Sequence, residues 1–143
     1  KAITYVRKIP IVSVSSLMAI AQVAIDNYSL DKIAVAMTAR KGKIYFGCYK
    51  KGEDSLAEEV IKDCLIDTDS FHFSDGSFYG VGNGYSQEIM SKKNNAIKLI
   101  NNPETVFPDA KTMIKNAIKK YELGIISNSF NIIPNYLMDE VAN

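Results

Sequence analysis

The sequence predicts an α/β domain in which helices flank a mixed sheet that contains a β-hairpin. Two strand-like segments, 33–39 and 44–49, are separated by a Lys-Gly pair, which is typical of a tight hairpin turn. Two segments with apolar residues at helical spacing, 17–28 and 109–121, lie on either side of the strand-like runs. Helices and strands mixed in this order are typical of layered α/β domains.

Composition is that of one globular domain spanning 1–143. Of the 143 residues, 47% are hydrophobic and 23% are charged, which excludes a disordered chain. The net charge of +1 gives no electrostatic footprint for nucleic acid. No apolar run approaches the roughly 20 residues that cross a bilayer, so we expect no membrane contact and a cytoplasmic location. Cys48 and Cys64 form no CxxC pair and read as core thiols.

The first elements are a strand and a helix. Ile9–Val14 is a short β-branched run, and it predicts a buried strand with Pro10 at its start. Ser15 and Ser16 offer N-cap oxygens to the helix that follows. The helix positions expected to face a core are Leu17, Ile20, Ala21, Ala24 and Tyr28.

The hairpin follows. Segment Ile33–Ala39 is apolar on both faces, which predicts a central strand covered on both sides. Lys41-Gly42 forms the turn, and the second strand alternates Ile44, Phe46 and Cys48 with Tyr45, Gly47 and Tyr49. Segment Glu58–Leu65 fits either a third strand or a short helix.

The second half begins with a predicted strand at Phe78–Val81, which leads into Gly82-Asn83-Gly84. A helix is expected from about Ser86 to Lys93, and another strand at Ala96–Ile100.

The strongest helix signal covers Asp109–Tyr121. Pro108 suits its first turn and Gly124 suits a C-terminal cap. Its apolar stripe, expected to face the core, consists of Ala110, Met113, Ile114, Ala117, Ile118 and Tyr121. The tail, Ile132–Val141, is predicted to be an ordered strap rather than a helix.

The glycine-rich turn at Gly82, Asn83 and Gly84 is the main candidate for cofactor binding. Glycines between a strand and a helix let a backbone approach a phosphate. The spacing, however, matches neither known phosphate-binding glycine motif, and no lysine follows it. A tight structural turn explains the glycines equally well and is the favoured interpretation.

The sequence gives little support for a catalytic, metal-binding or anion-binding site elsewhere in the chain. Ser70, His72 and Asp75 share one short loop, where a catalytic triad rarely converges. With one histidine and no HExxH motif, no metal ligand set is predicted. Arg40 beside the hairpin turn could bind a phosphate or carboxylate, but a structural ion pair is favoured. No catalytic residue, cofactor or metal is therefore assigned.

Four segments in order resemble the TsaB (YeaZ) family. They are KIPIVSVSSLMAIAQ (8–22), AMTARKGKIYFGCY (36–49), YGVGNGY (79–85) and PNYLMDEVAN (134–143). The positions that match the family patterns are Ser15, Ala39, Arg40, Gly42, Tyr45, Pro134, Tyr136, Leu137 and Val141, with Thr38 at a motif position where the family usually has Asp. Lys43 and Met138 also depart from the family's usual Glu and Arg.

The resemblance covers only part of the family's pattern. The family's opening strand with D-T-A/S and its G-P-G-S-F-T-G-x-R segment are absent. Residues 1–8 look like the last turns of the helix that follows that segment. The resemblance thus implies the second, C-terminal subdomain of a two-subdomain protein whose N-terminal subdomain is missing, leaving Ile3 and Val6 without their usual cover.

The resemblance also implies a fold and a role. The fold is that of the actin-like, sugar-kinase and Hsp70 ATPase superfamily. The role is that of a non-catalytic, glycoprotease-like subunit for threonylcarbamoyladenosine modification of tRNA. Its expected partners are the catalytic TsaD and the ATPase TsaE, with tRNA reached through the complex and a homodimer left open. The alternative is a nucleotide-binding kinase-like or hydrolase domain that uses Gly82–Gly84.

Overall fold

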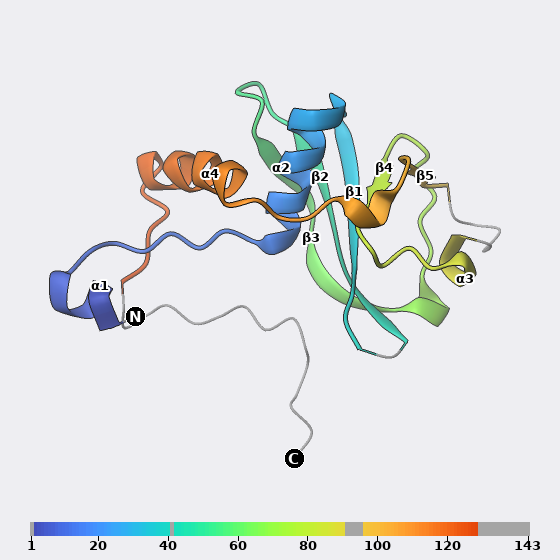
Figure 1. Ribbon diagram of the computed structural model, residues 1–143, viewed down its shortest axis with the longest axis horizontal. Helices are drawn as coiled ribbons and strands as arrows, with labels where there is room; N and C mark the ends of the chain where they lie inside the picture. Colours follow the sequence, from blue (N-terminus) through green and yellow to red (C-terminus); the bar gives the residue numbers. More distant parts are fainter. Residues whose placement is uncertain (1, 41, 91–95, 129–143) are drawn as a thin grey trace, which may run out of the picture.

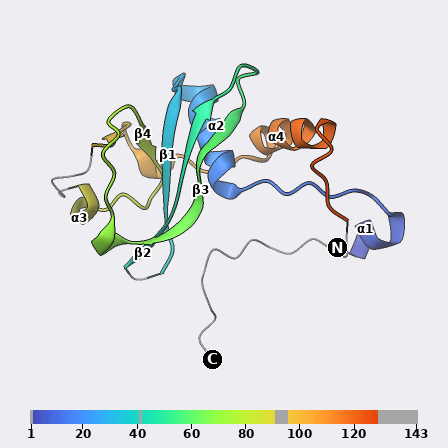
Figure 2. The same ribbon diagram turned by 180° about the vertical axis from the view of Figure 1, so that it is seen from behind.

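A five-stranded mixed sheet forms the centre of the computed structural model, which describes residues 2–40, 42–90 and 96–128 (Figures 1 and 2). The strand order is β3-β2-β1-β4-β5. The elements in chain order are α1 (Ala2–Arg7), α2 (Ser16–Tyr28), β1 (Lys32–Thr38), β2 (Lys43–Lys51), β3 (Ala57–Asp67), η1 (Thr68–Ser70), β4 (Tyr79–Val81), α3 (Gln87–Met90), β5 (Lys98–Leu99), η2 (Pro103–Thr105) and α4 (Ala110–Glu122).

The predicted hairpin is confirmed. Strands β1 and β2 pair antiparallel from Lys32 with Lys50 to Thr38 with Ile44, and Gly42 has the positive φ of 74° that the turn needs. Segment 58–65 is a strand, since β3 pairs antiparallel with β2. Strands β4 and β5 add in parallel on the other side of β1, at the positions expected for strands near 78–81 and 96–100.

Both faces of the sheet are covered. On one face Ile20, Ala21 and Ala24 of α2 are fully buried in the same cluster as Ile33 and Val35 of β1. On the other face four phenylalanines pack edge to face, with ring centroids 5.3 to 5.6 Å apart. They are Phe46, Phe71, Phe73 and Phe78. The prediction that β1, the first strand of the hairpin, is covered on both sides is therefore confirmed.

Two predictions in the first third are wrong. Segment 9–14 is a connector between α1 and α2 rather than a buried strand: Ile9 is 48% exposed, and among the described residues the segment forms a single bridge, from Ile11 to Ser127. The proline at its start removes a ladder donor, and none of the five described sheet strands pairs with it. Tyr28 is 43% exposed rather than core-facing, because α2 ends there and Ser29 turns the chain with a φ of 54°.

The later boundaries follow the prediction in part. Helix α3 lies inside the expected segment, of which residues 91–95 fall outside the described part of the chain. Pro108 comes before the N-cap Asp109 rather than in the first turn of α4. Gly124, with a φ of 73°, donates its N–H to the carbonyl of Tyr121 and ends α4 as predicted. The predicted tail strap at 132–141 lies outside the described residues.

Helix α4 lies at the same end of the molecule as α1, away from β4 and β5 (Figures 1 and 2). It reaches the body through α2, and its buried residues are Thr112 and Asn116. The prediction that its apolar stripe faces the core is wrong, since Ile114, Ile118 and Tyr121 are all more than half exposed.

Candidate functional site

The glycine-rich turn is shaped by close packing against β1. A side-chain carbon on Gly82, whose φ is 103°, would lie well inside van der Waals contact with the carbonyl oxygen of Ala36. One on Gly84 would lie 2.7 Å from the carbonyl carbon of the same residue. One on Gly80 would lie 2.6 Å from the Leu99 side chain. The glycines are therefore needed for the turn itself.

The polar groups of this turn bond within the protein. The Gly82 N–H donates to the carbonyl of Pro103 at 2.8 Å, and the Gly84 N–H donates to that of Ala36 at 2.9 Å. The Asn83 carboxamide oxygen accepts the Thr38 N–H at 2.9 Å, and the Asn83 carbonyl accepts the Thr38 hydroxyl at 3.1 Å. A phosphate cradle needs amides that point at the ligand, so these bonds favour the structural turn.

The hairpin residues of the family pattern lie next to this turn. Thr38 ends β1 and bonds to Asn83, while Ala39 donates its N–H to the carbonyl of Lys43. The Arg40 side chain is exposed and forms no salt bridge with another described residue. The ion pair that ties this end of the hairpin joins Lys43 to Asp67, at 2.9 Å.

Ser15 caps α2 and also binds a carboxylate. Its hydroxyl oxygen accepts the N–H of Leu17 at 3.0 Å and donates to Asp63. The Tyr49 hydroxyl donates to the same carboxylate, and burial together with this bond raises the pKa of Tyr49. Asp63 thus takes the place at the N-terminus of α2 that an external anion would fill.

Asp63 was not predicted from the sequence. The pairing of β2 with β3 shifts register between Cys64 and Ile61, which marks a bulge at this point. A side-chain carbon on Gly47 would lie 2.5 Å from an Asp63 oxygen, so the glycine makes room for the carboxylate. A single Asp in a segment of mixed polar and apolar residues predicts neither the bulge nor the space that Gly47 leaves for the carboxylate.

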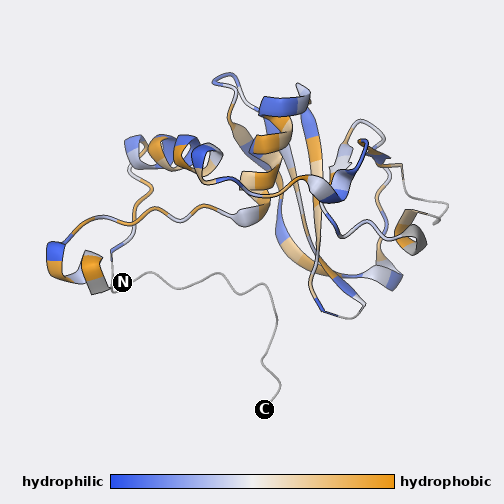
Figure 3. Cartoon of the chain, viewed as in Figure 1, coloured by the Kyte–Doolittle hydropathy of each residue, from blue (hydrophilic) through white to orange (hydrophobic). Residues whose placement is uncertain are grey.

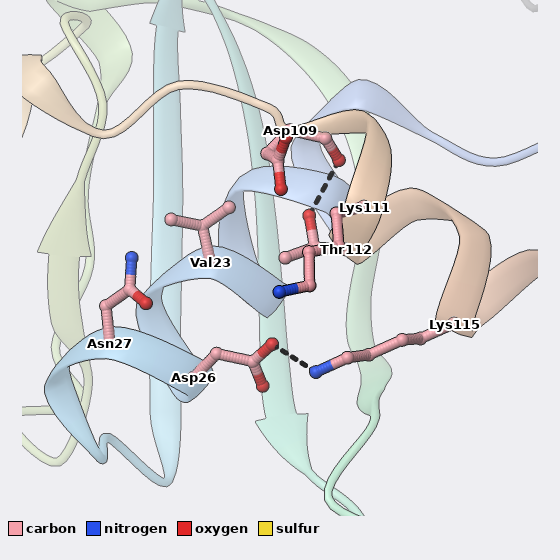
Figure 4. A pocket seen from close by; sticks show the side chains of 7 residues that line it. All are labelled: Val23, Asp26, Asn27, Asp109, Lys111, Thr112 and Lys115. Atoms are coloured by element: carbon pink, nitrogen blue, oxygen red, sulfur yellow. Dashed lines mark hydrogen bonds and ion pairs between the residues drawn. The ribbon is translucent and has the colours of Figure 1, made fainter.

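A groove of about 550 Å³ lies between α2 and α4 (Figure 4). Its charged residues pair within it: Lys115 reaches Asp26 at 2.7 Å, and the Lys111 charge also acts on Asp26. Burial would raise the pKa of Asp26, but hydrogen bonds from Lys115 and Gln22 outweigh it, and the pKa is lowered. The Thr112 hydroxyl donates to the Asp109 carbonyl at 2.8 Å. With its charges matched, the groove offers no nucleophile and base pair.

A buried glutamine holds α4 in place. Gln22 on α2 is fully buried; its side-chain oxygen accepts the N–H of Ala57 at 2.8 Å and the amide of Asn116 at 3.0 Å. Its amide nitrogen donates to Asp26 and to the carbonyl of Ser55, both at 3.0 Å. A buried amide requires such partners. These bonds turn the polar side of α4 inward, which explains why its apolar stripe is exposed.

The histidine loop and the thiols are not arranged for catalysis. His72 is exposed, the Ser70 hydroxyl donates to the Asp67 carbonyl, and Asp75 accepts from Ser77. Burial raises the pKa of Cys48 to about 12, and burial also raises that of Cys64. Such thiols are poor nucleophiles. Both cysteines are free and pack in or against the cluster on the phenylalanine face.

Among the described residues, no group of three or more His, Cys, Asp or Glu could hold a metal ion. No helix in that part of the chain is long and apolar enough to cross a membrane. The family-pattern residues Pro134, Tyr136, Leu137 and Val141 lie outside it.

Comparison with known proteins identifies the fold. No family model and no curated protein sequence matches the chain. Among solved structures, an uncharacterized protein with similarity to peptidase YeaZ from Pseudomonas aeruginosa matches with a TM-score of 0.81 at 19% identity, over 96% of this chain and 63% of that chain. YeaZ from Pseudomonas aeruginosa matches with a TM-score of 0.79 at 18% identity, over 94% and 64%.

The chain therefore spans less than two thirds of the length of either neighbour. At this identity the likeness is one of fold. It confirms the predicted α/β class, a mixed sheet with flanking helices, and the chain shares this fold with YeaZ.

Proposed function

We propose that this chain is a non-catalytic subunit in the threonylcarbamoyladenosine modification of tRNA. It acts as a partner of a TsaD-like catalytic protein and a TsaE-like ATPase, and reaches tRNA through their complex. The observation that carries this proposal is the shared fold with YeaZ over nearly the whole chain. The four sequence segments that resemble the same family, in the same order, support it.

The glycine turn supports a scaffolding role over the alternative of a nucleotide-binding kinase-like or hydrolase domain. Two of its N–H groups donate to Pro103 and Ala36, and the Asn83 side chain is bonded to Thr38. Nucleotide binding at this turn would require these bonds to break.

Reconstitution tests the proposal. The chain is combined with TsaD-like and TsaE-like proteins from the same source, an unmodified tRNA, threonine, bicarbonate, ATP and the enzyme that makes the threonylcarbamoyl donor. Complex formation is followed by size-exclusion chromatography, and modification by mass spectrometry of digested nucleosides. We expect modification to depend on the chain, with no modification when the chain is supplied without the TsaD-like protein.

Two results would count against it. If the chain forms no complex and modification proceeds equally without it, the proposed role is wrong. If the chain alone binds Mg-ATP in a calorimetric titration and hydrolyses it, the kinase-like or hydrolase alternative takes its place. A chain that binds both proteins and no nucleotide matches the subunit role.

A further inference from the structure

The glycine-rich turn contains a step that is chemically prone to deamidation. Asn83 is the one asparagine in the sequence that glycine follows. Because glycine has no side chain to hinder its backbone nitrogen, the Gly84 nitrogen can attack the side-chain carbonyl carbon of Asn83. A new C–N bond then forms, and the side-chain nitrogen leaves as ammonia. Water opens the resulting succinimide ring at either carbonyl, which gives aspartate or isoaspartate at position 83.

The folded structure holds both reacting groups away from this reaction. The Gly84 N–H, which must be released before its nitrogen can attack, donates to the carbonyl of Ala36 at 2.9 Å. The Asn83 side-chain oxygen accepts the Thr38 N–H at 2.9 Å, which fixes the orientation of the carboxamide. The Thr38 hydroxyl also donates to the Asn83 carbonyl, at 3.1 Å. The nucleophile and the carboxamide are therefore both bonded to β1.

The strand that holds the turn is itself held on both sides. Strand β1 pairs with β2 and with β4, and its middle is coloured as hydrophobic in Figure 3. Ala36 is fully buried, and Gly84 is buried against it. A side-chain carbon on Gly84 would lie 2.7 Å from the carbonyl carbon of Ala36. While the turn is closed, this packing leaves little room for a succinimide ring.

The turn can nevertheless open without loss of the sheet. Asn83 is exposed, and the strand before it, β4, has 3 residues. The bonds to Ala36 and Thr38, together with one from the Gly82 N–H to the Pro103 carbonyl, hold the turn in place. A short segment held by a few hydrogen bonds near solvent opens at a lower free energy than a packed core.

We propose that Asn83–Gly84 is a deamidation site, which the contacts with β1 keep closed and which reacts when the turn opens locally. Loss of ammonia makes the change irreversible. Isoaspartate also adds a carbon to the main chain between positions 83 and 84, so the Gly84 N–H and the Asn83 carbonyl can no longer both meet β1. Deamidation to isoaspartate therefore leaves the turn open. The inference is independent of the proposed function.

Ageing of the purified chain tests the site. The chain is kept in mildly alkaline buffer, either folded or unfolded by guanidinium chloride, and samples are digested over time. Mass spectrometry of the peptide that contains position 83 measures deamidation, and labelling by isoaspartyl methyltransferase measures isoaspartate. We expect the folded chain to react at least about tenfold more slowly than the unfolded chain. Hydrogen exchange of the Gly84 amide should be slowed by a similar factor, because both reactions need the same N–H to be released.

Two variants separate opening of the turn from unfolding of the whole chain. Thr38→Val removes the hydroxyl bond to the Asn83 carbonyl and keeps the N–H. Loss of one hydrogen bond should speed deamidation of the folded chain by about two- to tenfold. Ile25→Val is the matched control, because it shortens a buried side chain of α2 and lowers global stability by a similar amount. Its rate should equal that of the unmodified chain. Circular dichroism checks that both variants are folded.

The proposal is supported if Thr38→Val alone speeds the reaction of the folded chain, while all three proteins react equally fast when unfolded. A folded chain that reacts as fast as the unfolded one would overturn it, as would an unfolded chain that does not react. If both variants speed the reaction alike, the site opens by global unfolding and local opening is wrong. If Thr38→Val has no effect, the contacts with β1 do not control the site.

Discussion

Two helices of equal length make opposite use of their surfaces. Helices α2 and α4 have 13 residues each, and both carry apolar side chains at helical spacing. Helix α2 buries 8 of its residues, most of them apolar, against the sheet. Helix α4 buries Thr112 and Asn116, and presents its apolar stripe to solvent. An apolar stripe therefore predicts a helix, but not which side of that helix the rest of the domain covers.

Magnitudes explain the orientation of α4. Burying one large aliphatic or aromatic side chain is worth about 1.5–3 kcal/mol, so three exposed ones forgo several kcal/mol. Turning α4 to bury them would break the contacts that four residues make with the body: Asn116, Lys115, Lys119 and Lys120. A hydrogen bond contributes about 0.5–1.5 kcal/mol, and the exposed ion pairs contribute less because solvent screens them. The two terms are comparable inside one chain.

The largest expected difference is between alanine substitutions at two glycines, one in the turn beside β1 and one at the end of α4. Gly82 and Gly124 both have positive φ, but a side-chain carbon would strike the Ala36 carbonyl at Gly82 and meet nothing within 4 Å at Gly124. We expect Gly82→Ala to lower the free energy of unfolding by about 3 kcal/mol or more, and Gly124→Ala by about 1 kcal/mol. Urea denaturation measures both. Equal losses would mean that close packing against β1 does not matter.

A smaller contrast compares two isoleucines. Ile20 of α2 is fully buried, whereas Ile118 of α4 is largely exposed. Truncating a buried isoleucine to alanine costs about 2–5 kcal/mol through lost contacts and the cavity left behind. We expect Ile20→Ala to fall in that range and Ile118→Ala to change the free energy of unfolding by less than about 0.5 kcal/mol. Urea denaturation measures both. A large loss at Ile118 would mean that the stripe is covered within one chain.

The same contrast separates the features that the sequence predicts from those that it does not. The hairpin, α2 with its Ser15 cap, and the extent of α4 follow from local pattern, because turns, caps and periodicity involve neighbouring residues. The orientation of α4 depends on Gln22, whose partners other than Asp26 lie 33 to 94 positions away along the chain. No local pattern reports such a contact, so the burial of the stripe was predicted wrongly.

The candidate site shows the same limit. The glycines of the turn at 80–84 were visible, but not the Ala36 carbonyl that excludes side chains there. The strand expected at 9–14 had the right composition, but in the described part of the chain it pairs with no strand of the sheet. A buried polar residue inside an apolar helix, as at Gln22, was the one signal that could have been used.

Low pH should destabilise α4 before α2, and this is the smallest of the expected effects. The pKa values of Asp26 and Asp54, which hold Lys115 and Lys119 of α4, are both lowered from 3.8. A carboxyl group whose pKa is lower in the folded state stabilises that state at pH values above its unfolded pKa. This contribution is lost as the pH falls through the folded pKa. Between about pH 6 and pH 3, we therefore expect amide exchange, corrected for its intrinsic rate, to quicken in α4 before α2. The effect should be small, because both ion pairs are partly exposed to solvent, which screens them. Lys115→Met should already loosen α4 near pH 6 and reduce its further response to acid. If both helices lose protection together in the unmodified chain, the ionic contacts do not hold α4.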